Sequence, residues 1–121
     1  MSQVNIIIAA NDSARLYAAF EAAMAWAALG REVQVFAQGE AVAGLRRPII
    51  HPGDRARQAA GQPDLASLIT EARELGVQLF VCQSGLALAG LTMDDLAVGA
   101  TATGLVGYFA AIPQSAPVVT F

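Results

Sequence analysis

A nearly continuous apolar run at residues 4–10, followed by a long helical pattern and a second apolar run, constrains the fold of this chain most. Only Asn5 interrupts the first run, which is typical of a β-strand covered on both faces. Polar residues 11–13 can cap the alanine-rich helix that follows, and Gly30 can end it. A strand at residues 33–36 comes directly afterwards, so the three elements predict a βαβ unit with a parallel, right-handed crossover.

The rest of the chain continues the alternation of helices and strands. Asp64 begins a second helical pattern that ends at Gly76, and Thr92 with Asp95 has the spacing of a capping box. The further elements that we expect are a short helix at 41–45, a loop at 46–62, a strand at 77–81, a short helix at 84–89, a weak strand at 98–101, a helix at 105–112 and a strand at 118–121. Residues 1–121 therefore predict a single α/β domain, a three-layer α/β/α sandwich with a mainly parallel sheet of about five strands.

The chain is rich in apolar residues for its size. Hydrophobic residues make up 55% of its 121 residues, charged residues only 14%, and the mean hydropathy is +0.50. A monomer of this composition exposes an unusual amount of apolar surface. We therefore predict a homo-oligomer that buries one or more faces.

The two ends of the chain lack the patterns of a membrane span or an export signal. The first residues carry no basic segment, and their apolar run is too short for a signal peptide. Residues 96–121 are nearly uncharged, but glycines and prolines break them up. A single cysteine suits a reducing compartment, so we expect a cytoplasmic protein that does not contact a membrane. The net charge of −3 and the few aromatic residues argue against a nucleic-acid partner.

The carboxyl ends of the predicted strands are where a ligand would bind in an open parallel sheet. These ends correspond to residues 11–15, 38–41 and 82–85, which should share one edge. The first segment lacks the glycines of a dinucleotide-binding loop, and the chain has no phosphate-binding loop with Lys, so we expect neither cofactor. Asp12 is most simply a helix cap and Glu40 a loop charge, and no ligand spacing predicts a metal site.

Cys82 is the strongest candidate for chemistry. It stands at the end of a predicted strand, directly before a predicted helix start at Ser84. Backbone N–H groups and the positive end of a helix dipole favour a thiolate at such a position, so Cys82 can be a nucleophile. The alternative is that Cys82 packs in the core, as most free cysteines do. Position alone leaves both interpretations open.

His51 and a group of arginines are weaker candidates. His51 is the only histidine and can serve as a proton carrier for Cys82, but we favour a solvated turn residue. Four of the seven arginines fall within residues 46–57. They suit an anionic ligand or an acidic partner, or they simply keep a loop soluble.

Several stretches of the sequence resemble the DsrE/DsrF-like family, which includes the TusD-type sulfur-relay proteins. The most specific is the strand Gly-Val-Gln-Leu-Phe-Val-Cys at residues 76–82, followed by residues 89–96. The others are residues 6–15 leading into the alanine-rich helix that ends at 29–33, then 35–42, and the closing strand at 118–121. Together they cover nearly the whole chain, and residues 46–62 match least.

The resemblance implies that Cys82 carries sulfur as a persulfide and passes it to the thiol of an acceptor protein or a small thiol. It also implies an α/β/α sandwich that assembles into trimers, hexamers or mixed rings. The leading hypothesis is a sulfur carrier or sulfurtransferase-like subunit that uses Cys82 and needs no cofactor or metal. The alternative is a non-catalytic oligomeric module that binds a small ligand or a protein, with Cys82 in its core. Exposure of the sulfur at a cleft favours the first hypothesis, and apolar packing around it favours the second.

Overall fold

The structure of the protein is a computed structural model, and it describes residues 2–96 and 99–121. Its centre is one sheet of five parallel strands in the order β4-β3-β2-β1-β5. The strands are β1 (Gln3–Ile8), β2 (Glu32–Ala37), β3 (Gln78–Cys82), β4 (Thr101–Thr103) and β5 (Val118–Thr120). This sheet, with helices on both faces, confirms the predicted three-layer α/β/α sandwich.

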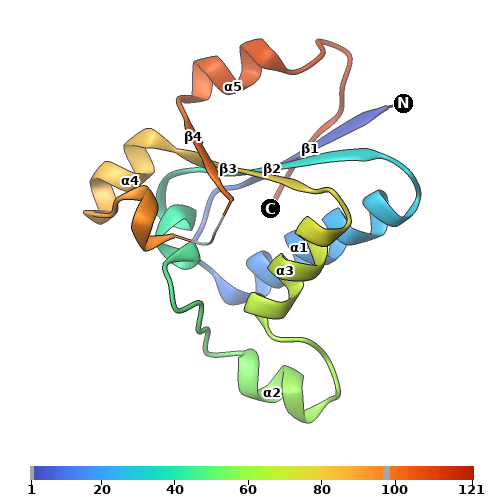
Figure 1. The fold of residues 1–121 in the computed structure, drawn as a ribbon, viewed down its shortest axis with the longest axis vertical. Helices are drawn as coiled ribbons and strands as arrows, with labels where there is room; N and C mark the ends of the chain where they lie inside the picture. Colours follow the sequence, from blue (N-terminus) through green and yellow to red (C-terminus); the bar gives the residue numbers. More distant parts are fainter. Residues whose placement is uncertain (1, 97–98) are drawn as a thin grey trace.

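The helices occupy three positions around the sheet (Figure 1). The two longest helices, α1 (Ser13–Ala28) and α3 (Leu65–Glu74), pack side by side on one face of the sheet, and the short helix α5 (Leu105–Ala111) lies over the other face. The remaining helical segments are short and lie in the connections between strands. They are the 3₁₀ helix η1 (Gly39–Leu45), α2 (Asp54–Ala59), α4 (Gln83–Ala89) and the 3₁₀ helix η2 (Met93–Asp95). None of the described helices is both long and apolar enough to cross a lipid bilayer.

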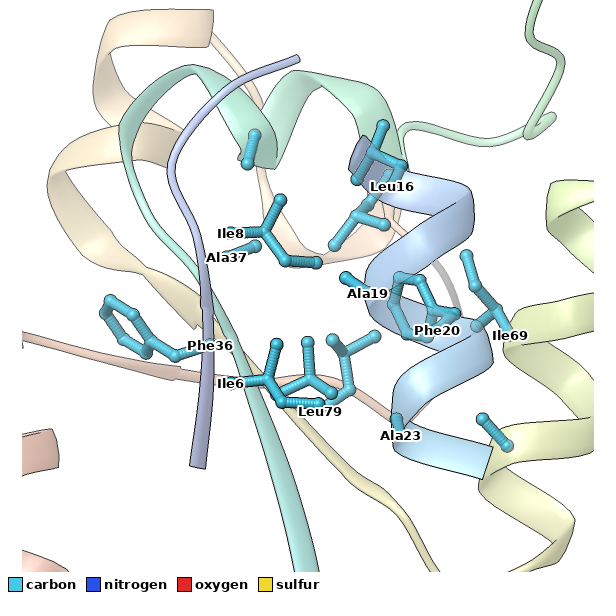
Figure 2. Packing of buried hydrophobic residues seen from close by; sticks show 14 of the residues in the cluster. Ile6, Ile8, Leu16, Ala19, Phe20, Ala23, Phe36, Ala37, Ile69 and Leu79 are labelled. Carbon is cyan, nitrogen blue, oxygen red and sulfur yellow. The ribbon is translucent and has the colours of Figure 1, made fainter. Parts of the chain in front are cut away.

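The main core lies between the sheet and helices α1 and α3. Figure 2 shows Ile6 and Ile8 pointing from β1 toward Phe20 of α1, and all three side chains are fully buried. Successive side chains of a strand point to opposite faces of the sheet, so the residues that alternate with Ile6 and Ile8 point toward the other face. Because both faces are covered, β1 carries the continuous apolar run seen in the sequence.

The second core, under α5, is smaller and partly polar. Tyr108 of α5 stacks on Phe36 of β2 with ring centroids 4.7 Å apart, and it meets Phe80 of β3 edge-on. The Tyr108 hydroxyl donates a hydrogen bond to the side-chain oxygen of the buried Asn5. The Asn5 amide in turn donates to the carbonyl of Pro117, just before β5. The polar residue that interrupts the first apolar run therefore ties β1 to α5 and to the approach of β5.

The predicted helix caps are present. The Asp12 carboxylate accepts the N–H of Ala14 at the start of α1, and the Asp64 carboxylate accepts the N–H of Ser67 at the start of α3. Thr92 and Asp95 form the expected capping box around η2. These local hydrogen bonds satisfy donors that a helix leaves unpaired at its first turn.

Two predicted segments were wrong. The strand expected at 98–101 lies at Thr101–Thr103 instead, and Val98, where it was expected to begin, is outside the described residues. The pairing of this strand with β3, which its own sequence does not signal, sets its position. The loop expected at 46–62 contains α2, a six-residue helix that buries no residue. Its sequence therefore lacks the apolar periodicity by which a helix is recognised.

Candidate functional site

Cys82 is the last residue of β3 and the N-cap of α4. The backbone of residue 82 is extended, and the chain turns into the helix at Gln83. The Cys82 side chain is only 4% exposed. The expected position of Cys82 at a strand end is therefore correct. The sulfur is not exposed to solvent in a single chain, although exposure was the feature expected of a sulfur carrier.

Several hydrogen-bond donors reach the Cys82 sulfur inside the buried core. The Ser84 hydroxyl lies 2.9 Å from Sγ, and backbone N–H groups of Ser84, Gly85 and Gly39 also point to the sulfur. Burial is the largest single influence on the pKa of the Cys82 thiol and raises it, but these hydrogen bonds together outweigh burial and bring the pKa below its usual value. Cys82 therefore belongs to the buried hydrophobic core, and a cradle of hydrogen-bond donors there stabilises its thiolate.

A cleft of about 430 Å³ lies beside this cradle. Gly39 and Gly85, which donate to the sulfur, also line the cleft, together with Asn11 and Glu40. The segments after β1, β2 and β3 therefore meet at one edge of the sheet, as predicted from the strand ends. Glu40 is part of the cleft wall rather than an isolated loop charge.

Gly85 allows α4 to lie against η1 at this edge. A Cβ atom on residue 85 would stand 2.5 Å from Cγ2 of Val42 and 2.8 Å from the carbonyl oxygen of Gly39. Both distances are far below ordinary contact, so only glycine fits. The roles of Gly39 and Gly85 were not predicted individually, and the sequence signal for them is that they lie two and three residues after the ends of β2 and β3.

Ser84→Ala is expected to raise the pKa of the Cys82 thiol, because it removes the hydroxyl that stabilises the thiolate. The rate of alkylation by iodoacetamide is proportional to the fraction of Cys82 present as thiolate. Below the thiol pKa, the variant should therefore react more slowly than the wild type. The rate measured as a function of pH tests this, and the two curves should approach one another at high pH. Identical pH profiles would show that Ser84 does not influence the sulfur.

His51 does not lie beside Cys82 in the role of a proton carrier. Its Nε2 is 2.8 Å from the carbonyl oxygen of Gly44, and its Nδ1 is 3.2 Å from the Ser13 hydroxyl. A carbonyl only accepts, so Nε2 carries the proton and Nδ1 accepts from Ser13. His51 is half-buried and joins its loop to the start of α1, which corrects the interpretation as a solvated turn residue.

The four arginines of residues 46–57 are divided by the fold. Arg46 and Arg47 lie next to η2: the side chain of Arg47 donates to the carbonyl of Asp94, and its backbone N–H donates to the carbonyl of Asp95. Arg57 lies over the Tyr17 ring and forms a salt bridge with Glu21, so it has a structural role. Within residues 2–96 and 99–121, no group of three potential metal-binding side chains comes together.

Comparison with known proteins places the chain among relatives of the same fold. It matches the crystal structure of the YchN protein from E. coli with a TM-score of 0.80, 18% identity and full coverage of both chains. It matches MTH1491 from Methanobacterium thermoautotrophicum with a TM-score of 0.78, 18% identity and full coverage of both chains. For BT1422 from Bacteroides thetaiotaomicron the TM-score is 0.69 and the identity 12%, over 99% of this chain and 95% of the other. No curated protein sequence matches the chain.

The sequence itself identifies the family. The profile of the DsrE/DsrF-like family matches residues 3–121, which is nearly the whole chain and includes Cys82 with its cradle. The resemblance noted on the strand that ends at Cys82 is thereby confirmed. This chain belongs to the DsrE/DsrF-like family.

Proposed function

We propose that the protein is a sulfur carrier, or a sulfurtransferase-like subunit, that forms a persulfide on Cys82 and passes the outer sulfur to an acceptor thiol. The observation that carries the proposal is the cradle of Ser84, Gly85 and Gly39 donors around Sγ, because the thiolate is the reactive form of cysteine. A TusD-type role within the family is part of the same proposal. The reducing cytoplasm is the compartment in which this thiol stays available.

The reaction consists of two thiol exchanges. The Cys82 thiolate attacks the outer sulfur of a donor persulfide, the new Sγ–S bond forms, and the donor thiolate leaves. An acceptor thiolate then attacks the outer sulfur of the Cys82 persulfide, and Cys82 leaves as a thiolate. Each step exchanges one S–S bond for another, so no oxidant or reductant is consumed. Since the chain has one cysteine, the acceptor thiol belongs to another molecule.

The cleft next to Cys82 supplies room for the transferred atom. The outer sulfur of a persulfide stands about 2 Å from Sγ, and Gly39 and Gly85 separate Sγ from the cleft with backbone alone. A donor or acceptor in this cleft therefore contacts the same two glycines that donate to the sulfur. The burial of Cys82 favours a second candidate function, a non-catalytic module that binds a small ligand or a protein, with Cys82 in its core.

Intact mass measurement separates the two functions. After incubation with a small-molecule persulfide donor, the wild type is expected to gain the mass of one sulfur atom, and a thiol reductant should remove it. Cys82→Ser is the matched control, because it exchanges only the sulfur of the sole cysteine for oxygen, and it should gain nothing. A wild type that gains no sulfur and whose thiol also resists alkylation in the folded state would falsify the carrier function in favour of the binding module.

We also propose that the protein is a homo-oligomer, a trimer or hexamer, that exchanges sulfur with an acceptor protein. Large apolar side chains remain exposed on one chain: Leu88 of α4 is 83% exposed and Val106 of α5 is 85% exposed. Leu88 also lines the cleft beside Cys82, so a second subunit on α4 would bring a subunit boundary to the site. Light scattering should give a mass that is three or six times the 12.5 kDa of one chain, and a mass of 12.5 kDa contradicts the proposal.

A further inference from the structure

We propose that a second cleft, lined by Arg46, Arg47 and His51, is an anion-binding subsite that takes the negatively charged end of the small molecule with which Cys82 exchanges sulfur. The assignment of the subsite to that exchange rests on the proposed function. The binding of an anion in the cleft does not depend on the proposed function, because it requires no sulfur chemistry.

The second cleft has a volume of about 550 Å³ and a lining that suits an oxyanion. Arg46 and Arg47 line it together with Asn11, Ser13 and His51, and none of its lining residues is acidic. The lining also includes Ser13, the first residue of α1, but the Asp12 carboxylate already caps that helix start, so the positive charge of the cleft comes from the two arginines. This is a concentration of positive charge in a chain whose net charge is −3.

The backbone of the arginine pair is held in place by the fold, and so is the side chain of Arg47. The backbone at Arg46 pairs with Leu96 in an isolated antiparallel bridge, and Arg47 is bonded to the carbonyls of Asp94 and Asp95. The carboxylate of Asp95 accepts the backbone N–H of Thr92, and the charges of Arg46 and Arg47 help to lower its pKa, so it balances part of the charge of the pair. Arginines that only keep a loop soluble need no such anchoring, whereas an anion site gains affinity when the backbone that carries its donors is fixed before the ligand arrives.

The floor of this cleft is also fixed. His51 bridges Ser13 and the Gly44 carbonyl, and its backbone N–H donates to Asp54 at the start of α2. The Asp54 carboxylate also accepts the Tyr17 hydroxyl at 2.6 Å. Hydrogen bonds thus fasten the loop before α2 to helix α1.

The anion cleft and the cleft beside Cys82 are neighbours. Asn11 and Ala43 line both of them, so one pair of side chains forms a shared wall. A molecule that binds its anionic group with Arg46 and Arg47 therefore extends past Asn11 toward Gly39 and Gly85, beyond which lies the sulfur. The chemical class that this arrangement recognises is a low-molecular-weight thiol or persulfide with a carboxylate, sulfonate or phosphate group.

The binding of sulfate tests the cleft without any sulfur transfer. Sulfate is titrated at constant ionic strength, with chloride as the balancing anion, and the backbone amide signals of Ser13 and Gly44 are followed by NMR. We expect saturable shifts in the wild type and in Cys82→Ser, and a dissociation constant increased about tenfold or more in Arg46→Ala/Arg47→Ala. Arg55→Ala removes the same charge from α2, outside the cleft lining, and should bind like the wild type. Shifts that do not saturate, or an equal loss in Arg55→Ala, overturn the site.

The transfer step tests the assignment to Cys82. The Cys82 persulfide is offered 2-mercaptoethanesulfonate or 2-mercaptoethanol, and rates are compared per thiolate present. The wild type should prefer the sulfonate several-fold, and Arg46→Ala/Arg47→Ala should lose that preference while Arg55→Ala keeps it. An unchanged preference in the double variant overturns the subsite. If Cys82 takes up no sulfur but sulfate still saturates the cleft, the proposed function fails and the anion site stands.

Discussion

Replacing Gly85 with alanine is expected to destabilise the protein by about 1–3 kcal/mol, the usual cost of extra volume in a packed site. The added Cβ would meet Cγ2 of Val42 at 2.5 Å and the Gly39 carbonyl oxygen at 2.8 Å. The backbone contact cannot be relieved by a rotamer change, so α4 must move away from η1. That movement withdraws the Gly85 and Gly39 N–H groups from the Cys82 sulfur, and iodoacetamide should therefore alkylate Cys82 with a different pH profile.

Gly104→Ala is the matched control for this prediction. A Cβ on residue 104 meets only the Gln83 side-chain oxygen, at 3.7 Å, which is an ordinary contact. Urea unfolding at one protein concentration, combined with the alkylation profile, should separate the two variants. If Gly85→Ala unfolds at the same urea concentration as Gly104→Ala and keeps the wild-type profile, the close packing of α4 on η1 does not hold the cradle together.

Leu16→Ala is expected to reduce the free energy of unfolding by about 2–5 kcal/mol. Leu16 is fully buried and points from α1 into the core under the sheet (Figure 2). Its loss removes apolar contacts and leaves a cavity that a packed interior cannot fully close. Leu29, at the other end of the same helix, is 76% exposed, so the same substitution there should change stability by about 0.5 kcal/mol or less.

The urea concentrations at which the two leucine variants are half unfolded provide the measurement. They can be compared directly if the free energy of unfolding falls with urea concentration at the same slope in both variants. Both variants lose the same atoms, so a difference between them reports burial alone. Similar midpoints for Leu16→Ala and Leu29→Ala would mean that the packing of α1 on the sheet does not dominate the stability of this fold.

Strong patterns allowed most of the fold to be predicted from the sequence. β1, α1 and β2 combine apolar runs, a cap at Asp12 and a stop at Gly30, so each level of the pattern indicates the same structure. α2 was missed because it buries no side chain, and its position depends on the contact between Asp54 and Tyr17. The strand Thr-Ala-Thr at β4 was misplaced because three residues cannot show a period, and pairing with β3 defines it.

The candidate site was predicted in outline only. Cys82 and the three strand ends followed from the general rule that parallel strands present their carboxyl ends at one edge. The donors to the sulfur could not be predicted, because Gly39 lies 43 residues before Cys82 and reaches it only through the packing of η1 against α4. The role of His51 was missed for the same reason, since its partner Ser13 is 38 residues away.

The strand order also affects how the sheet is assembled during synthesis. β1 is synthesised first, and one of its two edges pairs with β5, the last strand to be synthesised. That edge of β1 therefore stays uncovered until the end of the chain has been made. Until then β1, an isoleucine-rich strand, has an open edge on which another chain can add a strand. Its pairing with β2 is available much earlier, through the local crossover of α1. Aggregation of nascent chains should therefore be most probable in the interval after β1, α1 and β2 have formed and before β5 has been synthesised.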